Sequence, residues 1–262
     1  MPTRRTLLLS LAALCACGPP TVTRSAPGVH PLKDRIRGIE RHSLLFVPEG
    51  LTTEAPLLLA LHDTGGTPKE ELARWRAACS AEGWVGLFPD YPKEGFLDDN
   101  TNLAHVIQRA TAMGGVDPRR RFVAGHGTGG RRAYALAASH SGLLLAVATS
   151  GTVLSFTTGS EAPRAPGVSV LHLHGAKDDV VPLLGGPLPG DRKERSILPV
   201  AEALRPWVQL AGADTSPRVE GHRTTWAGTA HTVELVVDPE GGHVYGEAQI
   251  EAMRSFFRAR LP

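Results

Sequence analysis

The sequence has few cysteines, few aromatic residues and little net charge. Of its 262 residues only three are cysteines and 5% are aromatic, and the formal net charge is +2. Arg4 and Arg5 account for this charge, because every acidic residue follows position 17 and the remaining basic and acidic groups balance. A balanced charge gives no electrostatic reason to expect a nucleic-acid partner.

Cysteine and histidine are also not spaced as metal ligands usually are. The cysteines stand at positions 15, 17 and 79, and the 11 histidines form no HExxH motif. From these spacings we expect no metal site. If the two N-terminal cysteines are lipidated or removed, Cys79 has no partner, and we expect no disulfide in the mature domain.

The N-terminus has the features of an export signal. Arg4 and Arg5 precede an apolar run at residues 7–14, which is too short to span a bilayer permanently. The following Leu-Cys-Ala-Cys is typical of a bacterial lipobox and predicts Cys17 as the lipidated residue. An ordinary cleaved signal peptide is the alternative, and the paired arginines also loosely resemble a twin-arginine signal.

These features predict three segments along the chain. Residues 1–17 are expected to form the signal peptide and lipobox. Residues 18–35, rich in Pro, Ser, Thr and Gly at their start, are expected to form a flexible tether. Residues 36–262 are expected to form the folded domain, at an envelope location that faces either the periplasm or the outside.

The folded part alternates between strand-like and helix-like patterns. Strands are expected at residues 43–47, 57–61, 84–88, 122–124, 144–149, 168–173 and 232–237. Helices are expected at residues 69–81, 103–113, 130–139 and 247–260, and at 197–210 with a kink or break at Pro206. The alternation predicts an α/β fold with a mostly parallel central sheet and helices on both faces.

The segment at residues 121–130 carries the most chemical information. A short apolar strand runs into Gly-His-Gly-Thr-Gly and then into an Ala-rich helix. This order is typical of a nucleophile elbow, Gly-x-Ser-x-Gly, with Gly127 in the place of the serine. Glycine adopts the backbone of that position easily, but it has no hydroxyl with which to form an acyl-enzyme. A turn glycine in an unrelated loop is the alternative.

An acid and a base follow in the chain order of α/β-hydrolases. Asp178, with Asp179 as the second choice, comes just after the strand at 168–173. His243 lies on a Gly-rich loop after the strand at 232–237. Asp178 could orient His243, and His243 could then act as a base. Alone, His243 would be interpreted as a surface histidine.

A loop after an early strand could complete the site. The backbone N–H groups of Thr64 and Thr128 are candidates for an oxyanion hole. Thr128 also carries a hydroxyl, but one residue from the nucleophile position, and we expect it to point away from the base. Asp63 would oppose the charge that develops in the hole if its carboxylate points inward. His126 is expected to pack beside the turn.

Together these motifs resemble the secreted polyhydroxybutyrate depolymerase and feruloyl esterase family of α/β-hydrolases. The resemblance runs from about Ser43 to the C-terminus and includes Phe-Pro-Asp at 88–90, His-Gly to Val-Pro at 174–182 and Gly-Gly-His at 241–243. It implies hydrolysis of carboxylic esters by side chains and water alone, without a cofactor. Hydroxyalkanoate oligomers and hydroxycinnamate esters of polysaccharide are the implied substrates.

Three positions depart from the family pattern and lead to three hypotheses. Gly127 replaces the serine, Asp63 replaces the glycine of a His-Gly pair, and Val244 replaces an aromatic residue. The favoured hypothesis is a lipid-anchored homologue that binds an ester or polysaccharide-linked ligand but does not cleave it. The second is a hydrolase in which His243 activates water. The third is a scaffold without a ligand. The sequence does not define an oligomeric state.

Overall fold

The computed structural model describes residues 24–36, 39–91, 100–153, 167–190, 195–213 and 216–261. Its strands are β1 (Gly28–Ile36), β2 (Ile39–Val47), β3 (Ala55–Leu61), β4 (Val85–Pro89), β5 (Val116–His126), β6 (Ala146–Ser150), β7 (Ser169–Gly175), β8 (Gly186–Pro187), β9 (Ser196–Ile197), β10 (Arg218–Glu220), β11 (Arg223–Ala227) and β12 (Thr232–Asp238). Its helices are α1 (Pro68–Glu82), α2 (Asn100–Gly114), α3 (Gly127–His140), α4 (Val200–Ala203), α5 (Arg205–Leu210) and α6 (Glu247–Arg258), with a short 3-10 helix at Ser141–Leu143.

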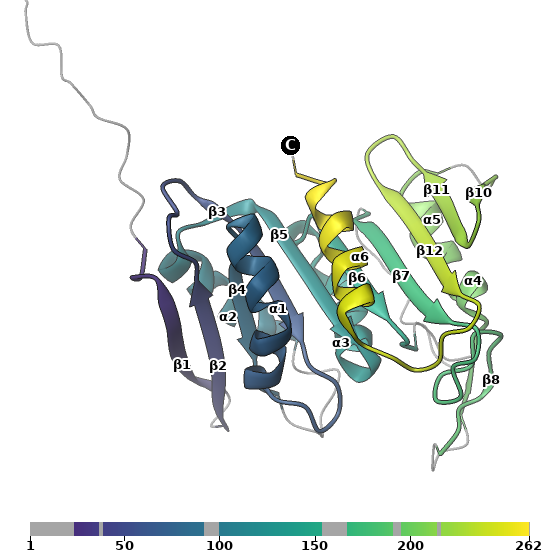
Figure 1. Ribbon diagram of the computed structural model, residues 1–262, viewed down its shortest axis with the longest axis horizontal. Helices are drawn as coiled ribbons and strands as arrows, with labels where there is room; N and C mark the ends of the chain where they lie inside the picture. The colour runs from purple at the N-terminus through teal and green to yellow at the C-terminus, as the bar shows by residue number, and fades with distance from the viewer. Residues whose placement is uncertain are drawn as a thin grey trace, which may run out of the picture.

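Ten strands form one twisted sheet in the order β1-β2-β4-β3-β5-β6-β7-β12-β11-β10 (Figure 1). The strands from β4 to β12 in this order are parallel to one another. Antiparallel hairpins extend the sheet at both edges, β1 and β2 on one side and β11 and β10 on the other. The predicted α/β fold with a mostly parallel sheet is confirmed.

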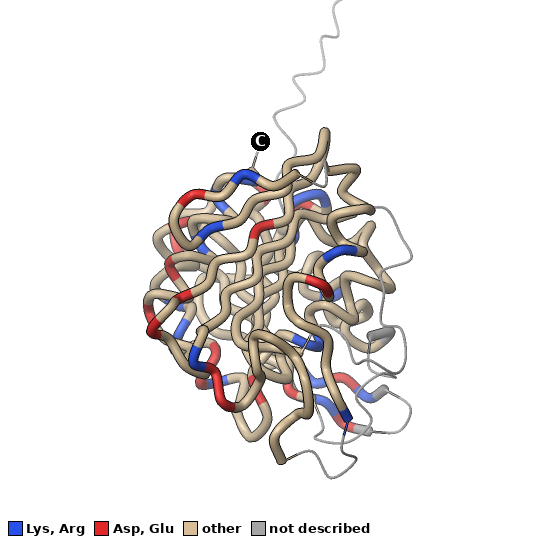
Figure 2. Tube along the Cα trace, turned by 90° about the vertical axis from the view of Figure 1, so that its right-hand side faces the viewer, with Lys and Arg blue, Asp and Glu red and all other residues tan. Residues whose placement is uncertain are grey.

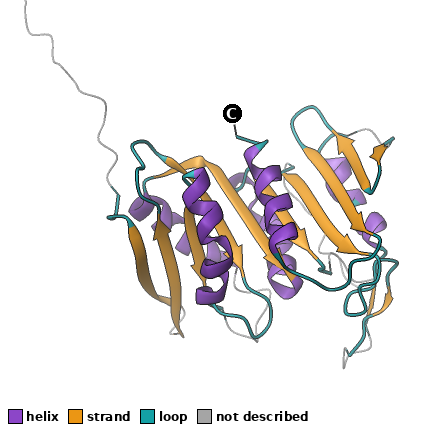
Figure 3. Ribbon diagram, in the orientation of Figure 1, coloured by secondary structure: helices purple, strands orange, loops and turns teal. Residues whose placement is uncertain are grey.

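Helices cover both faces of the sheet and bury a separate core on each (Figure 3). β3 shows how one strand serves both cores, because all seven of its residues are buried. Leu57, Leu59 and Leu61 belong to the core under α2, α3 and α5, whereas Leu58 and Ala60 belong to the core under α1 and α6. This double burial explains why the strand is a continuous apolar run rather than an alternating one.

The seven predicted strands and the main helices are present, and the differences lie at the sheet edges. Residues 28–35, which we expected in the tether, instead pair with β2 as the edge strand β1. That expectation was wrong because the alternating, partly polar pattern of an edge strand is weak in a Pro- and Gly-rich segment. The expected break near Pro206 appears as two short helices, α4 and α5.

The carboxyl ends of the parallel strands meet at one edge of the sheet, and the candidate site lies there. Asp63 follows β3, Gly127 follows β5, Asp178 follows β7 and His243 follows β12. The expected signal peptide and Cys17 lie outside the described residues. Within those residues, no helix is long and apolar enough to cross a membrane. Basic and acidic residues are interspersed along the chain rather than gathered by sign (Figure 2).

Candidate active site

The turn between β5 and α3 brings three glycines into close contact with the backbone around them. Gly127 has a φ of +52°, in the left-handed region that glycine adopts without strain. A Cβ on Gly129 would lie 2.1 Å from the carbonyl oxygen of Leu61, and one on Gly125 would lie 2.5 Å from the carbonyl carbon of Gly129. The outer glycines are therefore required for the elbow to pack against β3.

The carboxylate of Asp63 occupies the space in front of this elbow. A Cβ on Gly127 would lie 2.5 Å from Oδ1 of Asp63. The same oxygen accepts hydrogen bonds from the backbone N–H and the hydroxyl of Thr128, both at 2.8 Å. The dipole of α3 also favours an anion at this helix N-terminus. Asp63 thus takes the place that a nucleophile side chain would need, and it engages the N–H expected to bind an oxyanion.

Thr64 contributes to this arrangement through its hydroxyl. Its Oγ1 lies 2.9 Å from Oγ1 of Thr128. Since the Thr128 hydroxyl donates to Asp63, it can accept a hydrogen bond from Thr64 in turn. The two threonines predicted as oxyanion-hole residues therefore lie side by side, and their hydroxyls form a chain that ends on the carboxylate.

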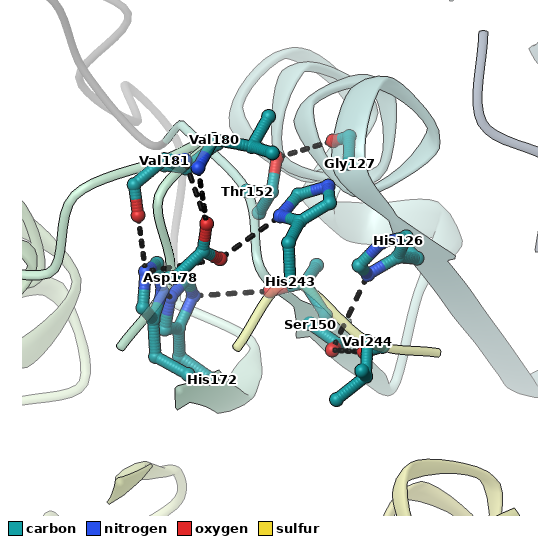
Figure 4. Close-up of polar contacts among 12 residues, drawn as sticks. His126, Gly127, Ser150, Thr152, His172, Asp178, Val180, Val181, His243 and Val244 are labelled. Atoms are coloured by element: carbon teal, nitrogen blue, oxygen red, sulfur yellow. Dashed lines mark hydrogen bonds and ion pairs between the residues drawn. The ribbon is translucent and has the colours of Figure 1, made fainter. Parts of the chain in front are cut away.

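Asp178 and His243 form a hydrogen-bonded acid–histidine pair (Figure 4). Oδ2 of Asp178 lies 2.9 Å from Nδ1 of His243. Asp179, the second choice from the sequence, is exposed. Burial alone would raise the pKa of Asp178, but hydrogen bonds from His243 and from the Val181 N–H hold that pKa below its usual value. The same bond to Asp178 raises the pKa of His243.

The loop after β7 holds Asp178 rigidly for this role. Its Oδ1 accepts hydrogen bonds from the backbone N–H groups of Val180 at 3.0 Å and of Val181 at 2.7 Å. The carbonyl oxygen of Val181 accepts a bond from Nε2 of His174 at 2.8 Å. The Asp178 carboxylate is therefore oriented through Oδ1 by its own loop and through Oδ2 by His243.

A chain of buried polar groups supports this loop from below. Because Nε2 of His174 donates to Val181, Nδ1 of His174 must accept, and it accepts from Nε2 of His172 at 3.0 Å. Nδ1 of His172 then accepts from the hydroxyl of Tyr134 at 3.0 Å, with Thr149 at 3.1 Å. Burial lowers the pKa of both histidines, so they remain neutral and keep these tautomers.

His126, the residue before Gly127, lies directly beside His243. Their ring centroids are 4.4 Å apart, and the other face of His126 stacks on Tyr245 at 5.1 Å. Nδ1 of His126 lies 3.4 Å from the hydroxyl of Ser150. Burial, and to a smaller extent the neighbouring His243, lower the pKa of His126 to about 4. At neutral pH His126 is therefore an uncharged imidazole within reach of the site.

A cleft of about 310 Å³ opens above these groups. Asp63, Gly127 and His243 line its floor, and the loops after β6 and β7 contribute Val153 and Val180 to its walls. Arg131 and Arg195 also line it, so its lining combines apolar, basic and acidic side chains. A site of this size accommodates a small ligand, with polar groups at its base.

The site residues expected from the sequence lie at this cleft or in contact with its lining: Gly127, Thr64, Thr128, His243 and, bonded to His243, Asp178. From the sequence, Asp63 is expected only as a conditional obstacle and His126 only as a residue that packs beside the turn. Their contacts cannot be found from spacing, because Asp63 follows β3 and His126 ends β5, and these strands become neighbours only in the sheet.

Comparisons with known proteins agree with this fold. No protein-family model matches the chain. The structure is similar to an acetyl xylan esterase from Aspergillus awamori, with a TM-score of 0.64 and 14% identity over 88% of this chain and 99% of that one. It is also similar to the esterase PE8, with a TM-score of 0.58 and 18% identity over 83% of this chain and 97% of that one.

Two curated relatives also match in sequence. One is "Putative esterase NocK" of Nocardia uniformis subsp. tsuyamanensis, 27% identical over 220 residues. The other is the bifunctional acetylxylan esterase/xylanase XynS20E of Neocallimastix patriciarum, 24% identical over 156 residues. The matches span 75% and 56% of this chain, but only 62% and 23% of the two relatives. The chain has the α/β-hydrolase fold, and the proteins it resembles are esterases of that type.

Proposed function

We propose that this protein is an exported, lipid-anchored α/β-hydrolase homologue that binds an ester-bearing ligand without cleaving it by a serine mechanism. One observation carries the proposal. The carboxylate of Asp63 lies 2.5 Å from the point where a side chain on Gly127 would begin, and it accepts the Thr128 N–H. The place of the nucleophile is therefore filled by a group bound to the oxyanion donor.

Two consequences follow for ester cleavage. Without a hydroxyl at position 127, no acyl-enzyme can form there. With a carboxylate on the Thr128 N–H, the negative charge of a tetrahedral intermediate would meet another negative charge instead of a free donor. Loss of one oxyanion donor alone typically costs about 10²–10³-fold in rate, and loss of the nucleophile costs more.

The cleft and the relatives together suggest the class of ligand. The cleft has room for a small ester group, and apolar and basic residues are among those that line it. Two of the similar proteins are named for acetyl xylan ester cleavage. We infer that the ligand is an esterified carbohydrate, or a small ester released from one, although hydroxyalkanoate esters would share the same chemistry.

The proposed anchor would hold this cleft close to a membrane. Cys17 is the proposed lipid attachment, and β1 begins at Gly28. A tether as short as residues 18–27 would keep the domain within a few tens of ångströms of the bilayer, at about 3.3–3.6 Å per extended residue. Metabolic labelling with a palmitate analogue, with Cys17→Ala as the control, tests the anchor.

A second function has one observation in its favour. Because the Asp178–His243 pair is intact at 2.9 Å, His243 could activate a water molecule that attacks the ester directly. This mechanism needs no nucleophilic side chain at position 127. It predicts a slow hydrolysis that disappears in His243→Ala.

The deciding experiment measures binding and turnover on the same purified protein. Acetylated xylo-oligosaccharides are titrated while ligand-detected NMR reports binding, and p-nitrophenyl acetate and butyrate report hydrolysis. We expect saturable binding, weakened in Val180→Asp, with no turnover above buffer. Turnover that is lost in His243→Ala would favour the water mechanism, and no binding to any ester would favour the scaffold.

A further inference from the structure

We propose that Asp63, His126 and His243 form a binding site for one divalent transition-metal ion, with zinc as the reference ion. This inference goes beyond the proposed function, since it holds whether or not the cleft retains any hydrolysis. One donor atom from each of the three residues lies within 4.8 Å of the other two. At zinc–ligand distances of about 2.0–2.1 Å and tetrahedral angles, two ligand atoms lie roughly 3.3–3.4 Å apart, so side-chain rotation has to bring the three donor atoms closer together.

The free nitrogen of each histidine can be assigned from its neighbours. Nδ1 of His243 is bonded to Asp178, which leaves Nε2 for a metal ion. Nδ1 of His126 faces the hydroxyl of Ser150, which also leaves Nε2.

The carboxylate of Asp63 also has an oxygen atom available for a metal ion. Its Oδ1 accepts hydrogen bonds from the two Thr128 donors, which leaves Oδ2 for coordination. The absence of a side chain on Gly127 is what gives this carboxylate its place, since a Cβ there would lie 2.5–2.7 Å from its three terminal atoms. The glycine and the aspartate are therefore parts of one arrangement.

The surroundings have the second layer of contacts that metal sites usually contain. Asp178 accepts a hydrogen bond from Nδ1–H of His243, which is the carboxylate–histidine–metal arrangement that fixes the tautomer and raises ligand basicity. Two carboxylates, Asp63 and Asp178, face the same histidine, and a dication would balance their charge. His126 is fixed by stacking on Tyr245.

The donor set indicates which ions fit. Two imidazoles and one carboxylate suit zinc and the neighbouring first-row metals rather than calcium or magnesium, which prefer oxygen ligands. Three protein ligands leave a fourth position for water or a ligand atom, and Asp63 and His243 both line the cleft into which that position would open. No short spacing predicts the site, because its residues are 63 and 117 positions apart in the chain.

The test is direct metal binding by the full-length protein after treatment with a chelator. Competition between the protein and a chromophoric chelator measures the affinity for Zn²⁺, and Co²⁺ provides a visible spectrum that reports coordination. We expect one ion per chain. Asp63→Asn, His126→Gln and His243→Gln should each weaken binding at least about 10-fold, and Asp178→Asn should weaken it about 10–100-fold.

Matched controls separate this site from weak surface binding. Glu49→Gln removes an exposed acid that has no part in the site, and His42→Gln removes an exposed histidine that pairs with Glu40. Neither should change the affinity. NMR of the histidine side chains provides a readout that does not require a variant to fold, since Zn²⁺ should shift Nε2 of His126 and His243. Unchanged affinity in the three ligand variants, or shifts at other histidines only, would overturn the proposal.

Discussion

The backbone N–H of Thr128 donates a 2.8 Å hydrogen bond to the carboxylate of Asp63. In an enzyme that uses a serine at the elbow, this N–H would face the developing oxyanion. Here the protein supplies its own anion to the same donor. The bare glycine at position 127 and the acid at position 63 are therefore coupled in space, and variants at the two positions should not act independently.

The first prediction concerns restoring a nucleophile. Gly127→Ser alone should remain inactive on p-nitrophenyl acetate, because its side chain would meet the carboxylate of Asp63 at 2.5 Å. The double variant Asp63→Gly/Gly127→Ser should hydrolyse the ester at least about 10²-fold faster than the single variant, since the Thr128 N–H is freed as a donor. Adding His243→Ala should remove this gain. A single variant as active as the double would contradict the coupling.

The second prediction concerns the packing of the elbow. Gly129→Ala should destabilise the fold by more than about 3 kcal/mol, because its Cβ would lie 2.1 Å from a backbone oxygen that cannot move aside. Gly142→Ala is the control, since its Cβ would meet nothing within 4 Å. That substitution should change stability by less than about 1 kcal/mol. Chemical denaturation measures both, and similar losses in the two variants would refute the explanation.

The third prediction tests the buried chain beneath Asp178. Tyr134→Phe removes a hydroxyl that lies 3.0 Å from Nδ1 of buried His172, and should cost about 1–2 kcal/mol of unfolding free energy. Tyr91→Phe is a matched control, because the Tyr91 hydroxyl is buried and has no hydrogen-bond partner among the described residues. Its removal should be neutral or stabilising. Thermal or denaturant unfolding compares the two, and equal effects would count against the chain.

The fourth prediction concerns pH. The pKa of Glu71 is raised to about 7, chiefly by burial; Arg74 and a bond to Tyr245 oppose the rise, and the charges of Glu70 and Asp63 add to it. The folded state therefore binds a proton that the unfolded state releases between about pH 4.5 and 7. This contribution to stability is complete below pH 4.5 and is lost as the pH rises through 7.

Substitution of Glu71 should remove that dependence. Glu71→Gln should have the same free energy of unfolding as the natural protein near pH 4.5. At pH 8 its free energy of unfolding should be higher by about 2–3 kcal/mol. Exposed Glu49→Gln should follow the natural protein at both values. Urea unfolding at pH 5 and pH 8 measures the difference. A constant difference between natural protein and Glu71→Gln would show that Glu71 does not titrate in this range.

The sequence predicted the fold well because the parallel strands are buried on both faces and therefore appear as apolar runs. β3 is the clearest case, with every residue buried. The edge strands β1, β10 and β11 were not predicted, since one face of each meets water and the pattern is diluted. At the site, residue order identified the elbow and the acid–histidine pair as candidates. The direction of the Asp63 side chain and the contact of His126 with His243 depend on how β3, β5 and β12 are placed, and no local pattern encodes that.

The contact between position 127 and Asp63 also limits the order in which this site could change. A serine introduced at position 127 first would meet the carboxylate, and it would lose the backbone freedom of a glycine at φ +52°. A small residue introduced at position 63 first would remove the obstacle at little steric cost. A serine nucleophile is therefore easier to introduce after position 63 has changed than before, and no single substitution at these two positions supplies one that is free of the carboxylate.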